Sequence, residues 1–294
     1  MKTVVVALVS ALLFSPGRTS NETPVNPCSE VLASAIPPRP ADAPTSSELM
    51  ETVWNLRGRE RDEAIVRELS RGNLPEFLRR LVPVRLWSRD RRGVFHEAII
   101  CVTPDYLSVG SNDDFVRVPL GLQAAVDTAR QFQFTLPTRK IVDAIYRQSS
   151  ARLAPRPMTP SSRMVSTRYF VEHNRIIEQQ RSGELGELIS GHKKDLILTK
   201  RLLTRKGRVA IYGWHEKAGQ PIQPLSTFHG ARYADYSHGV RLVSTTVILD
   251  GSPRSVYDIL RDSSVAGVLT YEGAIRDAAR LMQVEATPLK TPTD

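Results

Sequence analysis

The sequence of 294 residues has little cysteine and no long apolar run beyond its N-terminal segment. Its two cysteines, Cys28 and Cys101, allow only one intramolecular pairing, which excludes a larger disulfide framework. No segment after residue 20 has eighteen consecutive apolar residues, so the sequence does not support a lasting transmembrane helix. With 41% hydrophobic and 24% charged residues, the composition is that of a globular protein, which excludes disorder throughout.

The first twenty residues have the order of charge and polarity of a secretory signal peptide. Lys2 precedes an apolar run over residues 4–14, and small polar residues follow it up to Ser20. This run is too short to span a bilayer. We therefore predict a signal peptide over residues 1–20 and a secreted or periplasmic protein with no stable membrane insertion after cleavage. An uncleaved N-terminal anchor stays an alternative, because no Ala-x-Ala cleavage site is evident.

Export places both cysteines in an oxidising compartment. There a disulfide between Cys28 and Cys101 would tie the N-terminal tail to the first domain. The alternative is a buried Cys101 in an apolar strand and a free Cys28 in the tail. The sequence leaves both open.

The formal net charge of +9 favours anionic partners. For an exported protein these are cell-wall polymers, lipid head groups or acidic glycans. The basic residues are scattered in pairs and lack the aromatic interleaving of a single-strand binding groove, so we predict no nucleic-acid partner.

Proline and hydrophobic periodicity divide the chain. Six prolines in residues 21–45 are typical of an extended linker. Residues 46–155 begin with helical spacing and continue with period-two segments, at residues 82–88, 94–102 and 106–109. Prolines at 154–162 predict an internal boundary. We predict an α+β fold with a helical N-terminal segment, a small antiparallel sheet with helices, and a mixed α/β C-terminal part over 163–294.

The C-terminal part is predicted to begin with a helix and to continue with short strands. The helix is expected over residues 166–180, and the strands at residues 196–198, 208–214 and 240–249. Two closing helices are expected, one opened by Pro253 and ending near Asp262, the other from about Tyr271 to Met282.

The segment 228–242 is the most informative part of the chain, because it places His229, Asp235 and His238 among glycines. Imidazoles and a carboxylate are the ligands of a catalytic zinc, and this alternative takes His215, His229 and His238 as metal ligands. In a metal-free alternative, Asp235 orients a histidine that acts as general base. Purely structural histidines are the third interpretation. Neither His-x-His nor His-Glu-x-x-His occurs.

Two further histidines are catalytic candidates because they lie where an element ends. His192 follows Gly191 between a predicted helix and strand, and His215 ends an apolar strand beside Trp214. The competing interpretations are a helix cap for His192 and a rim histidine for His215. Asp195 is a further candidate.

Four residues near these histidines are candidates for binding substrate. Arg232 and Arg241 can clamp a carboxylate or phosphate, although surface arginines are commoner. Trp214 and Tyr236 supply aromatic surface. Ser237 lacks the Gly-x-Ser-x-Gly elbow, so a serine hydrolase of that fold is not indicated.

The residues His229-Gly230, Ser237-His238-Gly239 and Arg241-Leu242 resemble the active-site block of L,D-transpeptidases, which cross-link peptidoglycan peptides through a cysteine. That family has its cysteine directly after Ser-His-Gly, where this chain has Val240. The histidines and Asp195 also resemble those of metallopeptidases that cut cell-wall peptides, with different spacing. Several blocks of the sequence are similar to those of a group of secreted bacterial proteins, a resemblance that implies no activity.

The first hypothesis is a secreted hydrolase of an extracellular polymer, with cell-wall peptide as the expected substrate. Its site is built from five residues, His192, His215, His229, Asp235 and His238, with zinc as the possible cofactor in the metal version. The alternative is a non-catalytic module that binds anionic glycan or cell-wall fragments through its basic face and Trp214, Tyr233 and Tyr236. A structural envelope protein is the third hypothesis.

Overall fold

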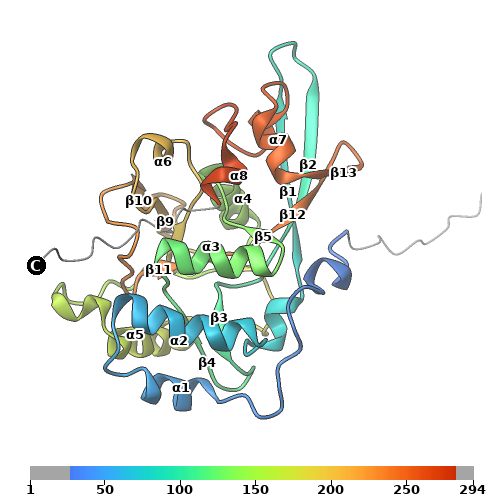
Figure 1. Ribbon diagram of the computed structural model, residues 1–294. Coiled ribbons are helices and arrows are strands. Elements are labelled where there is room, and N and C mark those ends of the chain that lie inside the picture. The colour runs from blue at the N-terminus through green and yellow to red at the C-terminus, as the bar shows by residue number, and fades with distance from the viewer. Residues whose placement is uncertain (1–26, 283–294) are drawn as a thin grey trace, which may run out of the picture.

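The strands β1 (Val82–Arg89) and β2 (Phe95–Val102) form an antiparallel hairpin that extends from one edge of the largest sheet (Figure 1). In β1, Val84 and Leu86 are buried while Arg85 and Trp87 are exposed, which is the predicted alternation. This computed structural model describes residues 27–282. The predicted signal peptide, residues 1–20, lies outside the described residues.

The same sheet joins the two halves of the chain. β12 (Val243–Leu249) pairs antiparallel with β2 and with β13 (Ser252–Ser255), and the short β5 (Phe134–Thr135) pairs with the start of β12. The predicted boundary at residues 154–162 therefore lies between parts that share one sheet. The α+β class is confirmed.

A second, mixed sheet has the strand order β10-β9-β8-β11. Its strands are β10 (Pro221–Ser226), β9 (Ile211–His215), β8 (Lys194–Leu196) and β11 (His238–Gly239). β11 runs parallel to β8, with His238 opposite Lys194 and Gly239 opposite Asp195. This pairing brings together two motifs that lie more than forty residues apart in the sequence. Two smaller ladders join β3 (Ser108–Gly110) to β4 (Phe115–Arg117) and β6 (Ala151–Arg152) to β7 (Ile189–Ser190).

The longer helices each bury one face, as their hydrophobic spacing predicts. Side-chain caps begin several of them: Thr45 and Glu48 form a capping box, and the hydroxyls of Thr138 and Ser166 accept from backbone N–H groups in the first turns that follow them. The α-helices are α1 (Ser46–Thr52), α2 (Gly58–Ser70), α3 (Leu122–Gln131), α4 (Arg139–Gln148), α5 (Thr167–Gln180), α6 (Arg201–Thr204), α7 (Val256–Arg261) and α8 (Ala278–Leu281). Between residues 27 and 282, no helix has the length and apolar character of a membrane span.

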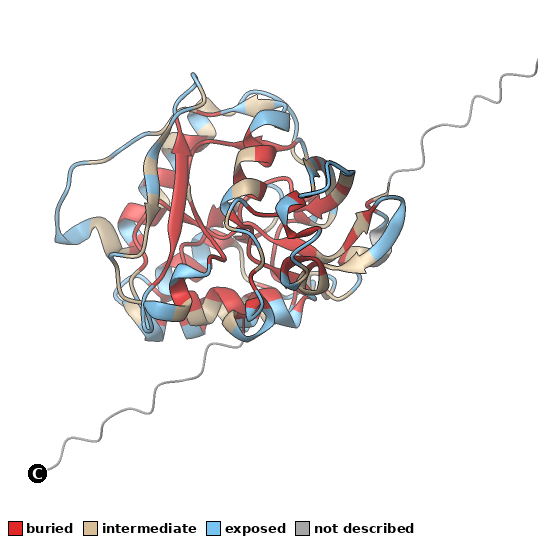
Figure 2. Cartoon of the chain, turned by 90° about the horizontal axis from the view of Figure 1, so that it is seen from above, coloured by how far each residue is buried: buried red, intermediate tan, exposed pale blue. Residues whose placement is uncertain are grey.

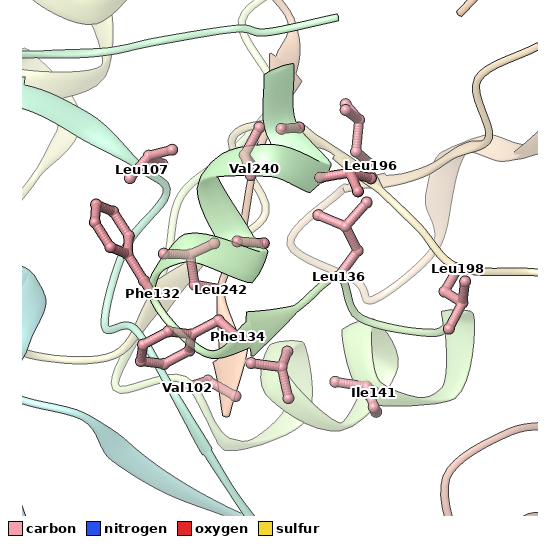
Figure 3. Packing of buried hydrophobic residues seen from close by; sticks show 14 of the residues in the cluster. Val102, Leu107, Phe132, Phe134, Leu136, Ile141, Leu196, Leu198, Val240 and Leu242 are labelled. Atoms are coloured by element: carbon pink, nitrogen blue, oxygen red, sulfur yellow. The ribbon is translucent and has the colours of Figure 1, made fainter. Parts of the chain in front are cut away.

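One hydrophobic core extends across both halves of the chain. Phe132 and Phe134 lie at the end of α3 and in β5, and Val240, Leu242 and Leu196 pack in the same cluster (Figure 3). Seen from above, buried residues fill the interior and exposed residues the rim (Figure 2). The helical and extended parts are therefore packed on one another through shared apolar side chains.

The prediction of an extended linker up to residue 45 is wrong for the described residues from 27 onward. Ile36 is buried, and the Arg79 guanidinium donates to the Pro37 carbonyl, at 2.5 Å. Arg39 donates to Asn73 over 3.0 Å. Proline lacks an N–H group that needs a partner, and side-chain donors from the body satisfy carbonyl oxygens, so this segment packs despite its composition.

Both closing helices differ from the prediction. The helix expected from Pro253 begins at Val256, because residues 252–255 pair with β12 as β13. The helix expected from Tyr271 is reduced to α8. Gly273 has a positive φ of 68°, and the Glu272 carboxylate accepts a hydrogen bond from Thr199 Oγ1 over 2.7 Å. This segment therefore turns toward residue 199 instead of forming a helix.

Cys28 and Cys101 form a disulfide that anchors the N-terminal segment to β2, with a sequence separation of 73 residues. Replacing both with alanine should lower the free energy of unfolding by about 4 kcal/mol. The disulfide closes a loop of this length in the unfolded chain and so lowers the conformational entropy of that state. Urea denaturation followed by circular dichroism measures the change. Wild-type protein under reductant should match the variant, and an unchanged midpoint would contradict the prediction.

Candidate functional site

The candidate residues lie in two clusters of polar side chains and one cleft. The first, called here the His238 group, consists of His229, Tyr233, Asp235, His238 and Lys194. The second is the buried Asp105 network around Asp105, Arg117 and His192. The third is the His215 cleft, which α4 and the β9–β10 hairpin line.

In the His238 group, hydrogen bonds to both carboxylate oxygens hold Asp235 in place. Its Oδ1 accepts from the Ser237 backbone N–H over 2.8 Å and from the Ser237 hydroxyl over 2.5 Å. Its Oδ2 accepts from the Tyr233 hydroxyl over 3.1 Å and lies 3.9 Å from His238 Nε2. Burial acts to raise the pKa of Asp235, but His238 and the Ser237 hydrogen bonds outweigh it and hold the pKa below its usual range. Asp235 is therefore a carboxylate at neutral pH.

His238 is completely buried, and neither ring nitrogen has a hydrogen-bond partner among residues 27–282. Burial lowers its pKa to about 4, although Asp235 acts in the opposite direction, so the imidazole is neutral at pH 7. Buried polar atoms in native structures are generally hydrogen-bonded. An imidazole with two unpartnered nitrogens beside a carboxylate is unusual for a purely structural residue.

His229 brings the group to the surface. Its ring stacks on Tyr233 with centroids 4.1 Å apart and lies 6.2 Å from the ring of His238. Both His229 and Tyr233 are half-buried. Burial lowers the pKa of His229, while Asp235 acts to raise it. Lys194 adds a cation whose Nζ lies 4.8 Å from the ring centre of Trp214. The group thus runs from a half-exposed imidazole to a buried one.

The Asp105 network lies in the interior. Arg117 Nε donates to Asp105 Oδ2 over 2.9 Å, and Arg117 Nη2 lies 2.8 Å from Glu178. His192 Nε2 lies 3.2 Å from Asp105 Oδ1. Burial lowers the pKa of His192 to about 4, although hydrogen bonding to Asp105 acts against it. His192 therefore faces an internal ion pair, and both it and the pair are buried.

Four further predicted residues, Asp195, Arg241, Trp214 and Tyr236, lie in the interior. Tyr106 donates to Asp195 over 2.8 Å, and burial raises the pKa of Asp195 to about 6. The Arg241 guanidinium stacks 4.3 Å above Tyr106 and donates to the carbonyls of Thr103 and Ile189. Trp214 and Tyr236 are buried in one aromatic cluster. Of the four predicted substrate-binding residues, Arg232 alone is exposed.

His215 lies apart from both the His238 group and the Asp105 network. Its Nε2 lies 3.4 Å from Asp143 Oδ1, and its ring stacks on Tyr146 with centroids 4.4 Å apart. Tyr212 donates to the same Asp143 oxygen over 2.7 Å. These side chains line a cleft of about 550 Å³. His215 thus borders a cavity.

The structure brings together His229, Asp235 and His238, while His192 and His215 contact other carboxylates, Asp105 and Asp143. Within the described part of the chain, no three His, Cys, Asp or Glu side chains are arranged to hold a metal ion. The zinc set of His215, His229 and His238 stays a prediction, and the residues as they lie do not fit it.

Sequence reasoning missed several charged residues, including the buried Asp105 and Arg117 and the partly buried Asp143. It also missed Lys193, which is buried, donates to the Tyr236 carbonyl over 2.6 Å and lies 3.1 Å from His173 Nδ1. Burial lowers the pKa of Lys193 to about 7. Nothing in the local pattern signals this, because a Lys-Lys pair is ordinarily solvated.

No family model matches the chain, and no curated protein or solved structure was found that matches it significantly. The resemblance to L,D-transpeptidases therefore stays a prediction from the short block 229–242.

Gly239 positions the His238 group by close packing, since a Cβ there would lie 2.5 Å from the Tyr106 ring and 2.9 Å from Lys193 Cβ. Gly239→Ala should lower the free energy of unfolding by about 1–3 kcal/mol through overpacking. Gly230→Ala is the matched control, because the nearest atom there is 3.9 Å away. Thermal unfolding of both variants compares them, and equal stability would contradict the packing argument.

Proposed function

We propose that the chain is a secreted hydrolase of an extracellular polymer and that the His238 group is its metal-free acid–base site. The proposal rests on one observation, the contact between His229 at the surface and the buried His238. Both ring nitrogens of His238 lack a hydrogen-bond partner among the described residues. Cell-wall peptide is the proposed substrate class, which rests on the resemblance of residues 229–242 to the transpeptidase block.

His229 is the general base in this proposal. It reaches the surface, and its pKa lies below the usual value because of burial, so the imidazole is neutral at pH 7 and can accept a proton from water. Asp235 is the nearby anion that stabilises the imidazolium formed by this transfer. Tyr233 positions the ring of His229 by stacking and holds Asp235 by its hydroxyl.

His238 is a positioning residue behind this pair. Its neutral ring beside Asp235 leaves the carboxylate without a cationic hydrogen-bond partner inside the protein, since the closest His238–Asp235 approach is 3.9 Å. The negative charge of Asp235 therefore remains available to His229. The proposed steps use protein side chains alone, and hydrogen bonds from Ser237 and Tyr233 hold the Asp235 carboxylate in place.

The direct test is hydrolysis of purified bacterial peptidoglycan, followed by chromatography of the released peptides. His229→Ala should lower kcat/KM by about 100-fold or more, the range for loss of a general base. His96→Ala is the matched control, because His96 lies on β2, contacts Asp250 and is not part of the His238 group. Metal analysis of the same preparation distinguishes the zinc alternative from the metal-free proposal. The zinc alternative requires stoichiometric metal and a loss of activity when a chelator is added.

Two outcomes would overturn this proposal. Full activity of His229→Ala would remove His229 as the base. Absence of turnover by wild-type protein that still binds peptidoglycan would favour the non-catalytic binding module.

The pH profile gives an independent test of the base. Since the pKa of His229 is lowered, kcat/KM should rise with pH, with its midpoint below the ordinary histidine value of about 6.5, and then level off. Asp235 acts to raise this pKa, so Asp235→Asn should move the midpoint to still lower pH while lowering the plateau. A midpoint that moves upward in Asp235→Asn would contradict the electrostatic role.

A further inference from the structure

The His215 cleft has more cationic than acidic side chains in its lining. Three arginines and a lysine line it, namely Arg139, Arg147, Arg152 and Lys217. None of these four forms an ion pair within residues 27–282, although the arginines make other contacts. The single acidic residue of the lining, Asp143, already accepts from Tyr212 and faces His215.

The arginines are held in place by neutral groups. Arg152 donates to the carbonyls of Tyr146 and Arg147 over 3.0 and 2.6 Å, and its guanidinium lies 5.3 Å from the Tyr146 ring centre. Arg139 lies 5.4 Å from the ring centre of Tyr212. Carbonyls and rings orient a guanidinium but leave its full charge uncompensated. Such arginines are suited to pairing with carboxylate or phosphate oxygens.

A second cleft of about 230 Å³ adjoins the first through the shared Arg139. Its lining adds Lys200 and Arg201, while its one carboxylate, Glu272, accepts from Thr199 Oγ1 and the Lys200 backbone N–H. The two clefts therefore form a cationic surface longer than a single small anion requires. α4 contributes Arg139 and Arg147, and α6 contributes Arg201 (Figure 1).

We propose that these two adjoining clefts bind a linear polyanion whose carboxylate or phosphate groups pair with Arg139, Arg147 and Lys217. His215 stacks on the Tyr146 ring and Arg152 lies over the same ring, so we base recognition on charge and not on stacking against Tyr146. This site is separate from the His238 group, and its function does not depend on hydrolysis.

The test is fluorescence polarisation with the mature protein and two labelled probes, an oligogalacturonate and a linear polyphosphate. The double variant Arg139→Gln/Lys217→Gln should weaken binding about tenfold or more, since it removes two charged contacts. Arg91→Gln/Arg92→Gln is the matched control, because it makes the same change in net charge at the exposed turn of the β1–β2 hairpin. His229→Ala should bind as wild type does.

The two probes distinguish the source of the anion. Binding of the oligogalacturonate alone supports an acidic glycan, and binding of polyphosphate alone supports a phosphate polymer; each supports the site if the cleft variant weakens it. Failure of both probes to bind wild-type protein overturns the proposal. Equal weakening by the cleft and control variants also overturns it, because net charge would then explain the affinity. Neither failure bears on the activity of His229→Ala toward peptidoglycan.

Discussion

The buried ion pair between Arg117 and Asp105 is the interaction on which the rest of the structure depends. Removing two charges from water is favourable only when each is paired and hydrogen-bonded, and breaking such a pair costs about 3–5 kcal/mol. Here Arg117 lies on β4, Asp105 follows β2, and Glu178 on α5 and His192 complete the contacts. One network therefore joins two neighbouring segments within residues 105–117 to two within residues 178–192.

Arg241 extends the same constraint to the segment that carries the His238 group. Its guanidinium bridges the carbonyls of Thr103 and Ile189, so the residues after β11 are tied to the segments next to Asp105 and His192. Gly239 also packs closely against Tyr106, the residue that follows Asp105. The half-exposed His229 and the cationic clefts then lie on a framework whose position is set by buried charge as well as by apolar packing.

The sequence predicted much of the local structure. Alternation identified β1 and β2, and helical spacing identified α5 to within a residue, because these elements each bury one face. It failed where tertiary contacts override composition. The proline-rich segment after residue 27 packs because Arg39 and Arg79 satisfy carbonyls, and the C-terminal helix shortens because Glu272 binds residues 199 and 200. For the candidate site, local spacing was enough to group His229, Asp235 and His238, which one loop holds.

By itself, the sequence determined the α+β class, the positive charge, the single possible cysteine pairing and the local cluster around Asp235. These properties depend on composition or on neighbours within a few residues. Only the tertiary structure decided that Cys28 and Cys101 pair, that Arg241 and Lys193 are buried, and that His192 and His215 face Asp105 and Asp143. The partners of a buried charge are set by which distant segments pack together, and periodicity along the chain contains no information about them.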